Sequence, residues 1–280
     1  MTLILAATPL GNPGDASTRL REAIESAEII AAEDSRRFHR LCADIGVTFT
    51  GRVISFFEGN EDARSAEILE ALANGKNVLI VSDAGMPTIS DPGFRVMRDA
   101  ISKNFEVSVF PGPSAVTMAI ALSGLPTDRF TFEGFLPRNS GARSAHLEKL
   151  RFEERTMVFF EAPHRLVDSL KDAQSVFGSE RDGAICREMT KRYEEIKRGN
   201  LSELNAWASD REILGEITLV IAGAQLGAQE STTDAMVARV REFEGAGMDR
   251  KSAIAAVAEE FSIAKRIVYA AVVDANKMST

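Results

Sequence analysis

Residues 3–14 read Leu-Ile-Leu-Ala-Ala-Thr-Pro-Leu-Gly-Asn-Pro-Gly. The run over residues 3–7 is apolar and has the length of a buried strand. The Pro and Gly residues after it predict a turn. Apolar residues then recur from Leu20 to Ala27 at the spacing of one helix face. A buried strand, a glycine-bearing turn and an amphipathic helix, in this order, predict the first unit of an α/β sheet.

The same alternation continues along the first part of the chain. Further strand-length apolar runs, separated by segments of helical length, lie at residues 29–32, 53–56, 78–81 and 107–110. Alternation of this kind predicts a largely parallel sheet covered by helices. We therefore expect a first α/β domain over residues 1–111.

A second α/β domain is predicted over residues 112–224. Pro111-Gly112-Pro113 breaks the first pattern and leads into a predicted helix. The expected strands are residues 130–135, 156–160, 184–187 and 217–221, and the expected helices are residues 114–122, 142–150 and 165–176. Residues 193–197 and 201–207 are shorter and ambiguous. Some connections are too short for crossovers, which predicts a more antiparallel sheet.

A small C-terminal domain is predicted over residues 232–280. Residues 223–233 have the composition of a linker. Helices are expected at residues 234–243, 250–261 and 263–275, with a break at Ser262. The last two helices fit either a helix-turn-helix-like unit or the arm of a dimer, and the sequence leaves both open.

Charge and composition exclude several classes of protein. Lys and Arg number 33 against 41 Asp and Glu, a net charge of −8, so any nucleic-acid contact must come from local basic patches. Two cysteines exclude a Cys-rich zinc site, and no cluster suggests another metal. No stretch approaches the roughly 18 apolar residues of a membrane span. We expect a cytoplasmic protein without membrane contact.

The most unusual stretch is residues 82–93, Ser-Asp-Ala-Gly-Met-Pro-Thr-Ile-Ser-Asp-Pro-Gly. It follows a predicted strand and so lies at the carboxyl edge of the sheet, where α/β proteins bind ligands. Its glycines and prolines predict an irregular backbone whose amides can approach a ligand. Asp83 suits an ammonium group or a ribose diol, and Asp91 is predicted to cap the next helix.

Two other strand ends carry candidate chemistry. Gly11-x-x-Gly14, with Glu33-Asp34 further on, partly fits a dinucleotide site, but the third glycine of that motif is missing. Residues 186–195 combine both charges beside a strand end. They are interpreted either as a solvated face with weak ion pairs, or as phosphate contacts (Arg187, Lys191) beside a base or orienting group, Glu188.

Several short motifs occur in order and together carry a family resemblance. They are Thr8-Pro9-Leu10-Gly11-Asn12, Ala32-Glu33-Asp34-Ser35-Arg36, residues 82–93, residues 110–115, Gly134-Phe135-Leu136-Pro137-Arg138, residues 161–165 and residues 187–191. The chain resembles the tetrapyrrole methylase superfamily over residues 3–222, and within it the branch that methylates small-subunit ribosomal RNA. It departs from the usual pattern at Pro13-Gly14, at Ser35 in place of Thr, and at Asn139 in place of Lys.

The resemblance implies a fold and an activity. The fold is α/β, with two domains of the tetrapyrrole-methylase type, a cofactor cleft between them and a small C-terminal helical domain. The activity is transfer of the methyl group of S-adenosylmethionine to the 2′-hydroxyl of a cytidine in 16S rRNA of the small ribosomal subunit. It also implies a homodimer.

The resemblance implies the following site residues. The expected cofactor-binding residues are Pro9, Leu10, Gly11, Asp83, Ala84, Gly85, Met86, Pro87, Ser90, Ser114, Ala115, Glu161, Ala162, Thr218 and Leu219. The expected RNA contacts are Arg36, Arg138, Arg143, His164 and Arg165. The catalytic candidates are Glu188, Lys191, Arg187 and Asp34, and the base is not singled out among them.

Two other functions stay open at this point. One is methylation of a tetrapyrrole or another small acceptor by the same fold, although the basic stretch at residues 187–198 and the helical tail are not needed for a small substrate. The other is a non-enzymatic RNA-binding assembly factor that retains a cofactor pocket.

Overall fold

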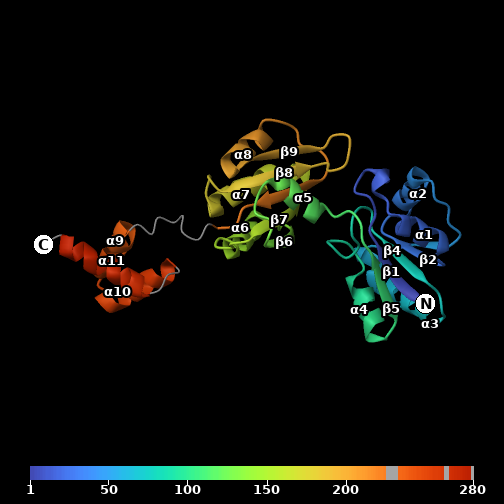
Figure 1. Ribbon diagram of the computed structural model, residues 1–280, viewed down its shortest axis with the longest axis horizontal. Coiled ribbons are helices and arrows are strands. Elements are labelled where there is room, and N and C mark those ends of the chain that lie inside the picture. Colours follow the sequence, from blue (N-terminus) through green and yellow to red (C-terminus); the bar gives the residue numbers. More distant parts are fainter. Residues whose placement is uncertain (225–232, 262–264, 279–280) are drawn as a thin grey trace. The chain divides into compact units, whose positions relative to one another are not determined.

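The computed structural model describes residues 1–224, 233–261 and 265–278. Contacts within the chain divide it into two compact units, Met1–Gly223 and Ala224–Thr280 (Figure 1). Within the described ranges, no helix has the length and apolar character needed to cross a membrane.

The first sheet contains five parallel strands in the order β3-β2-β4-β1-β5. Their bounds are β1 (Thr2–Ala6), β2 (Ile29–Ala32), β3 (Arg52–Ser55), β4 (Val78–Val81) and β5 (Glu106–Phe110). Helices α1 (Thr18–Ser26) and α2 (Ser35–Ile45) pack on one face, and α3 (Glu61–Ala73) and α4 (Phe94–Ser102) pack on the other. The predicted parallel sheet covered by helices is confirmed.

The strand order places a topological switch point between β4 and β1. The connection after β1 runs through α1 to β2 on one side, and the connection after β4 runs through α4 to β5 on the opposite side of β1. The loops after these neighbouring strands therefore leave in opposite directions. In open α/β sheets, ligands bind outside the carboxyl ends of strands at such a switch point.

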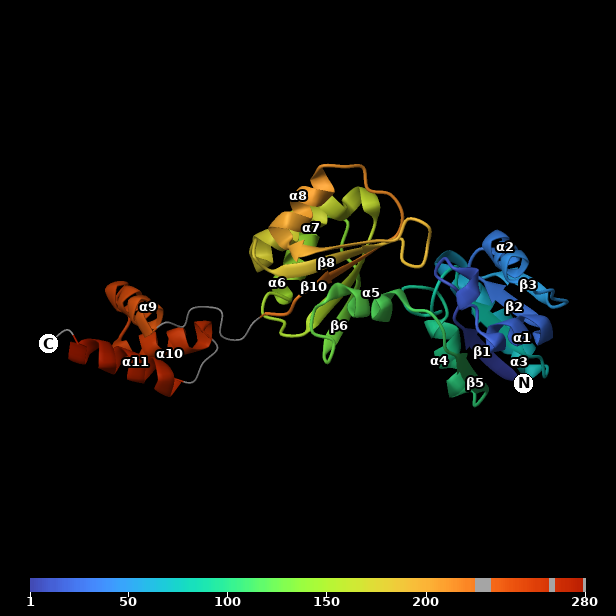
Figure 2. The ribbon, with the colours of Figure 1, turned by 45° about the horizontal axis from the view of Figure 1, so that its top comes forward.

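The second sheet has the order β6-β7-β10-β8-β9. Its strands are β6 (Phe130–Phe135), β7 (Thr156–Glu161), β8 (Asp182–Arg187), β9 (Glu195–Asn200) and β10 (Ile217–Ile221). Only β6 and β7 pair in parallel, and the other three pairs are antiparallel, which confirms the prediction for this half. Helix α5 (Ala115–Ser123) packs on one face, and α6 (Ser140–Lys149), α7 (Leu166–Phe177) and α8 (Leu201–Ser209) pack on the other (Figure 2).

The two ambiguous segments have different structures. Residues 195–200 form the edge strand β9, although their composition is charged, because they pair with β8 along its whole length. Residues 201–209 form α8, which begins with a capping box: the Asn200 side chain accepts from the Glu203 N–H at 2.9 Å, and the Glu203 carboxylate accepts from the Asn200 N–H at 3.1 Å.

The C-terminal unit contains α9 (Thr233–Gly245), α10 (Arg250–Glu260) and α11 (Lys265–Met278). They enclose their own core, in which Val240, Val257 and Val268 are fully buried. The predicted three helices are confirmed, whereas residues 225–232 of the predicted linker and the predicted break at Ser262 lie outside the described residues. The division into domains 1–111, 112–224 and 232–280 remains our proposal.

Candidate functional site

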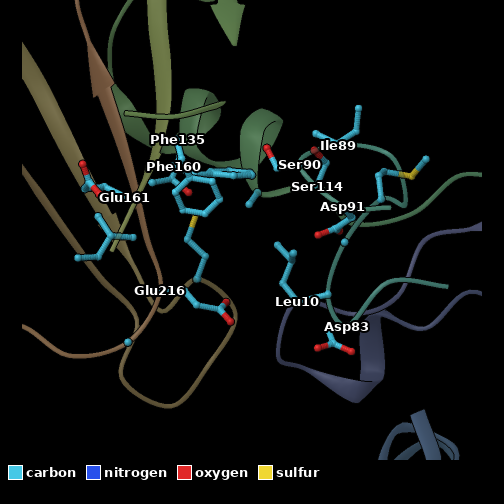
Figure 3. Close-up of a pocket in the computed structure, with 18 of the residues that line it drawn as sticks. Leu10, Asp83, Ile89, Ser90, Asp91, Ser114, Phe135, Phe160, Glu161 and Glu216 are labelled. Atoms are coloured by element: carbon cyan, nitrogen blue, oxygen red, sulfur yellow. The ribbon is translucent and has the colours of Figure 1, made fainter. Parts of the chain in front are cut away.

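A cavity of about 360 Å³ lies at the switch point of the first sheet and is closed by residues of the second sheet (Figure 3). That volume falls in the range of small-molecule sites. The loops after β1, β2 and β4, together with helix α2, supply Leu10, Glu33, Arg37, Asp83, Ala84, Gly85, Met86, Ile89, Ser90 and Asp91. The other lining residues are Ser114, Ala115, Phe135, Phe160, Glu161, Ala162, Pro163, Met189, Gly215, Glu216, Ile217 and Thr218.

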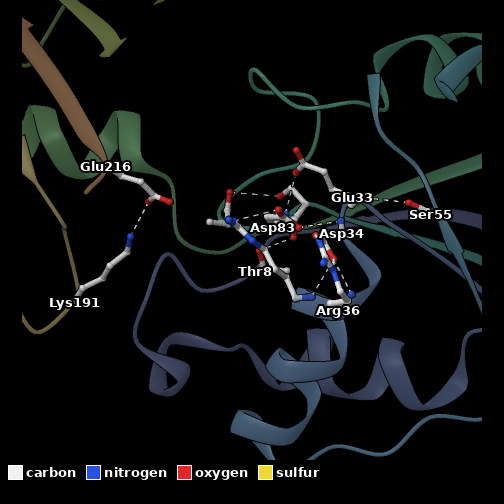
Figure 4. Close-up of polar contacts among 11 residues, drawn as sticks. Thr8, Glu33, Asp34, Arg36, Ser55, Asp83, Lys191 and Glu216 are labelled. Carbon is white, nitrogen blue, oxygen red and sulfur yellow. Dashed lines mark hydrogen bonds and ion pairs between the residues drawn. The ribbon is translucent and has the colours of Figure 1, made fainter. Parts of the chain in front are cut away.

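The loop after β4 is tied to the loop after β1. Thr8 and Gly85 exchange two backbone hydrogen bonds, from Thr8 N to Gly85 O at 2.9 Å and from Gly85 N to Thr8 O at 3.1 Å. The buried Thr8 hydroxyl donates to Ser82 O at 3.2 Å (Figure 4). At the far end of the loop, a nearly buried Glu61 accepts from Gly93 N at 3.0 Å. These contacts fix both ends of the segment that forms one wall of the pocket.

Backbone strain concentrates in the loops beside this pocket. Five non-glycine residues of the described chain have positive φ, and four of them are Thr88 (76°), Ser90 (63°), Glu188 (51°) and Thr190 (66°). Such conformations cost about 1–3 kcal/mol each and persist where the surrounding structure imposes them. Their position in the loops after β4 and β8 supports a functional role for both loops.

Carboxylates line one side of the cavity. Asp83 accepts from Asp34 N at 3.0 Å and lies 3.2 Å from the Arg37 guanidinium. Glu33 accepts from Asp83 N at 3.1 Å (Figure 4). Burial raises the pKa of both Glu33 and Asp83 above the ordinary values. The acidic wall therefore favours a ligand that carries positive charge.

Asp91 does not cap α4, and this prediction was wrong. The N-cap of α4 is Gly93, which has φ 125° and carries no side chain. Asp91 lines the pocket instead, and its carboxyl group points into the cavity in Figure 3. Burial, followed by repulsion from Glu33, raises the pKa of Asp91 to about 7.

Aromatic side chains form the opposite wall. Phe160 of β7 packs between Phe132 and Phe135 of β6, with ring centroids 4.8 and 5.5 Å apart. Phe135 is 56% exposed, which is unusual for a large apolar side chain and leaves its ring available to a flat ligand or base. Figure 3 shows Phe135 and Phe160 across the cavity from Asp83 and Leu10.

Two of the catalytic candidates, Glu188 and Lys191, contact each other, but beside the pocket rather than in its lining. Lys191 Nζ lies 2.8 Å from Glu188 Oε1 and 2.9 Å from Glu216 Oε2. Glu188 also accepts from Glu216 N at 2.8 Å. Burial disfavours the Lys191 ammonium, but its hydrogen bonds outweigh burial and raise the lysine pKa. Arg187 is engaged with Glu195 at 3.1 Å and with Leu214 O at 3.1 Å.

The fourth catalytic candidate, Asp34, has a local role. Its carboxylate caps α2, where it accepts from Arg36 N at 2.8 Å, and pairs with the Arg36 guanidinium at 2.8 Å. Hydrogen bonds from Arg36 lower the pKa of Asp34 far below its ordinary value. A carboxylate of such low basicity is a poor proton acceptor at neutral pH.

Most of the predicted cofactor residues line the cavity. These are Leu10, Asp83, Ala84, Gly85, Met86, Ser90, Ser114, Ala115, Glu161, Ala162 and Thr218. The side chain of Glu161 is fully buried, and its carboxylate accepts from Ser169 at 2.5 Å and from Ala162 N at 2.7 Å.

Four predicted cofactor residues are not among the lining residues: Pro9, Gly11, Pro87 and Leu219. Leu219 belongs to the core beneath α7, because side chains alternate along β10 and Thr218 takes the other face. Gly11 instead lies beneath Lys191, since a Cβ atom built on it would overlap that side chain.

Two of the predicted RNA contacts are structural. Arg143 is 4% exposed and lies 2.7 Å from Asp172. Arg165 lies 3.3 Å from Glu161 and donates to the carbonyl groups of Leu136 and Pro137. With side chains only 5% and 15% exposed and with these partners, the two guanidinium groups stabilise the packing and offer little surface to phosphates. The other three, Arg36, Arg138 and His164, are exposed.

Sequence reasoning missed several pocket residues. They are Glu33, Arg37, Ile89, Asp91, Phe135, Phe160, Pro163, Met189, Gly215, Glu216 and Ile217. Glu33, Ile89, Asp91, Phe135, Pro163 and Met189 lie inside motifs quoted in the sequence analysis, so neighbouring positions gave a signal. Glu216 is brought to the cavity by the antiparallel pairing of β8 with β10, which no local pattern reveals.

Two sheets that contribute loops to one pocket at a switch point define a class of two-part α/β proteins that bind a small molecule between their sheets. The family model that matches residues 2–205 is described as Tetrapyrrole (Corrin/Porphyrin) Methylases. The chain belongs to this family.

Two relatives illustrate the match at the level of sequence. A protein of Mycobacterium bovis named ribosomal RNA small subunit methyltransferase I is 49% identical over 256 residues, which cover 91% of this chain and 88% of that protein. A protein of the same name from Pseudomonas aeruginosa is 38% identical over 270 residues, which cover 96% of this chain and 95% of that protein.

Solved structures share the fold at lower identity. A diphthine synthase superposes with a TM-score of 0.58 and 16% identity, covering 79% of this chain and 89% of that one. A uroporphyrin-III C-methyl transferase from Thermus thermophilus, complexed with S-adenyl homocysteine, superposes with a TM-score of 0.56 and 15% identity, covering 79% of this chain and 96% of that one.

Proposed function

We propose that the chain transfers the methyl group of S-adenosylmethionine to the ribose 2′-hydroxyl of a cytidine in 16S rRNA of the small ribosomal subunit. The chain is an S-adenosylmethionine-dependent methyltransferase of its family. The observation that carries the rRNA substrate is identity of 38–49% over nine tenths of the chain to proteins named for that activity. The alternatives of a small acceptor or of a non-enzymatic factor have no comparable support.

The pocket fits the cofactor by its own chemistry. S-adenosylmethionine supplies a methyl group on a positively charged sulfur, together with an ammonium group and a flat adenine. Glu33, Asp83 and Glu216 place negative charge around the cavity, which stabilises a cation there. Leu10 and the ring of Phe160 give apolar surface for a flat base.

The chain's own contribution to the reaction is positioning and proton handling. Methyl transfer is an in-line displacement, so holding the two reactants in line supplies a large share of the rate. The loop 82–93, fixed by Thr8 and Glu61, provides a wall that does not need to reorganise. A ribose hydroxyl is a weak nucleophile, so its proton must be accepted as the bond forms.

The RNA side of the proposal rests on exposed groups near the pocket. Arg36, Arg138 and His164 are exposed, and Arg37 lines the cavity with a 65% exposed side chain. Phe135 offers a ring on which an unpaired base can stack. A target nucleotide turned out of its stack would bring its ribose to the pocket, as in other enzymes that act on single nucleotides.

We also propose a cytoplasmic homodimer. Phe94 and Ile101 of α4 and Val109 of the edge strand β5 are each about half exposed, which gives an apolar face that a second copy would cover. Light scattering on the purified protein tests this: a monomer at micromolar concentration would contradict it.

Mass mapping of 16S rRNA from cells with and without this protein tests the proposed function. We expect one 2′-O-methylated cytidine to lose its ribose methyl group when the protein is absent and to regain it when the gene is restored. Identical maps would contradict the proposal.

A further inference from the structure

The pocket contains one carboxyl group that is held differently from the others. Glu33 accepts a backbone N–H, Asp83 is paired with Arg37, Glu161 accepts from Ser169, and Glu216 is paired with Lys191. Asp91 has no cationic partner within the described part of the chain, and the nearby Ser82 hydroxyl, which lowers its pKa, donates to Gly85 O at 3.1 Å. It is therefore the pocket carboxyl group that other protein atoms engage least.

Asp91 also lies where a proton acceptor for the reaction is needed. The group projects into the cavity from the strained loop, next to Ser90 and facing the wall formed by Phe135 and Phe160 (Figure 3). A base must reach the reacting hydroxyl, and Glu188, Lys191 and Asp34 do not line the cavity.

We propose that Asp91 accepts the proton of the acceptor hydroxyl during methyl transfer, an inference that rests on the function proposed above. In that step the hydroxyl oxygen bonds to the methyl carbon, and the bond from that carbon to sulfur breaks with its electron pair left on sulfur. The hydroxyl proton moves to a carboxylate oxygen of Asp91. The positive charge on sulfur and the negative charge on Asp91 both disappear, so charge balances and no oxidant or reductant is needed.

The surroundings of Asp91 suit this task near neutral pH. The charged groups that face it are Glu33, Asp83 and Glu216, and all three raise its pKa, while burial contributes most and the Ser82 hydroxyl opposes. Arg37, which lines the cavity, is already paired with Asp83, and Lys191 beside the cavity is paired with Glu216. A proton acceptor works best when its pKa lies near the working pH, and that of Asp91 lies at about 7.

Asp91→Asn tests the proposal, because asparagine has nearly the same shape and cannot accept the proton. We expect kcat on small ribosomal subunits to fall at least ~100-fold, with the Kd for S-adenosylmethionine and for the subunit changed less than about threefold. The acid limb of the kcat profile near pH 7 disappears in the variant. Asp62→Asn, at an exposed acid outside the pocket paired with Arg95, is the matched control and leaves kcat unchanged.

A second measurement does not depend on turnover. Carbon-13 NMR of the carboxyl groups in the protein without cofactor should show one signal that titrates near pH 7 and is absent from Asp91→Asn. The inference is overturned if kcat falls less than tenfold, if the Kd for S-adenosylmethionine rises in step with the loss, or if Asp91 titrates at its ordinary pKa. If the unmodified protein transfers no methyl group to rRNA, the proposed function itself fails. If the unmodified protein methylates rRNA but Asp91→Asn changes neither kcat nor the titration, only the role of Asp91 fails and the proposed function stands.

Discussion

The ammonium nitrogen of Lys191 lies 2.9 Å from a carboxylate oxygen of Glu216, which lines the pocket (Figure 4). The stem of the same lysine covers Gly11 in the loop after β1, so one side chain connects loops of both sheets. A Cβ atom at Gly215 would likewise overlap Glu188, the second partner of Lys191. We interpret Glu188, Lys191 and Glu216 as an ion-pair network that holds the pocket wall in position.

Lys191→Met should therefore loosen the site. Losing two partly buried ion pairs costs about 1 kcal/mol, which lowers Tm by about 2–4 °C in a chain of this size. The affinity for S-adenosylmethionine should weaken, since Glu216 is no longer held. Lys149→Met, at an exposed lysine of α6, is the control. If Lys191 instead contacts phosphate, Tm stays unchanged and the salt dependence of subunit binding flattens by ~0.7–0.9 log units per contact.

Asp83→Asn should weaken binding of S-adenosylmethionine without unfolding the protein. The carboxylate faces the cavity beside Arg37, and loss of a charge-assisted contact costs about 1.5–3 kcal/mol, a tenfold to hundredfold rise in Kd. Calorimetry measures the change directly, with Asp62→Asn alongside. An unchanged Kd would mean that Asp83 only shapes the turn.

Thr88→Gly should relieve backbone strain in the pocket loop without lowering the stability of the fold. Thr88 has φ 76°, which glycine adopts freely, so the substitution relieves about 1–3 kcal/mol of strain against about 0.4–1 kcal/mol of added freedom in the unfolded chain. Tm should be unchanged or higher, while the Kd for S-adenosylmethionine rises because the loop is less well ordered. Thr127→Gly, at an exposed position without positive φ, should lower Tm. A lower Tm for Thr88→Gly would contradict the account.

Removal of divalent metal should leave cofactor binding unchanged. The described residues contain no group of three or more His, Cys, Asp or Glu side chains suited to hold a metal ion. Calorimetry of S-adenosylmethionine binding with and without a chelator checks this. Loss of binding on chelation, with recovery on adding magnesium, would overturn the expectation.

Asp91 should also give stability a pH dependence of known sign. Its pKa is raised from 3.8 to about 7, so between those values the folded chain keeps a proton that the unfolded chain has lost. Stability from this group therefore declines as pH rises through that window. The Tm of Asp91→Asn minus that of the unmodified protein should increase from pH 4 to pH 8. A difference that is flat or falls with pH would contradict the raised pKa.

The apolar patterns predicted the sheets well for a physical reason. Strands buried on both faces, such as β4 (Val78–Val81), must be apolar throughout, so they are visible in the sequence. The edge strand β9 is stabilised by pairing with β8 and needs no apolar run, so its charged residues gave no signal.

Contacts between distant residues could not be predicted. Gly11 belongs to a turn whose composition is typical of a cofactor-binding loop. The side chain that covers it is that of Lys191, which lies far along the chain. Asp91 lies where a helix cap is expected, but the helix begins at Phe94 and its N-cap is Gly93. Arg143 and Arg165 carry the charge that RNA needs, and only the packing reveals that Asp172 and Glu161 already neutralise it.

The most direct measurement uses purified components. Small ribosomal subunits that lack the modification are incubated with the protein and S-adenosylmethionine carrying an isotopically labelled methyl group, and the nucleosides of 16S rRNA are analysed by mass spectrometry. The account predicts label in 2′-O-methylcytidine, at a single position, and a large loss of label with Asp91→Asn. Label on a base, or no label in the rRNA, would contradict it.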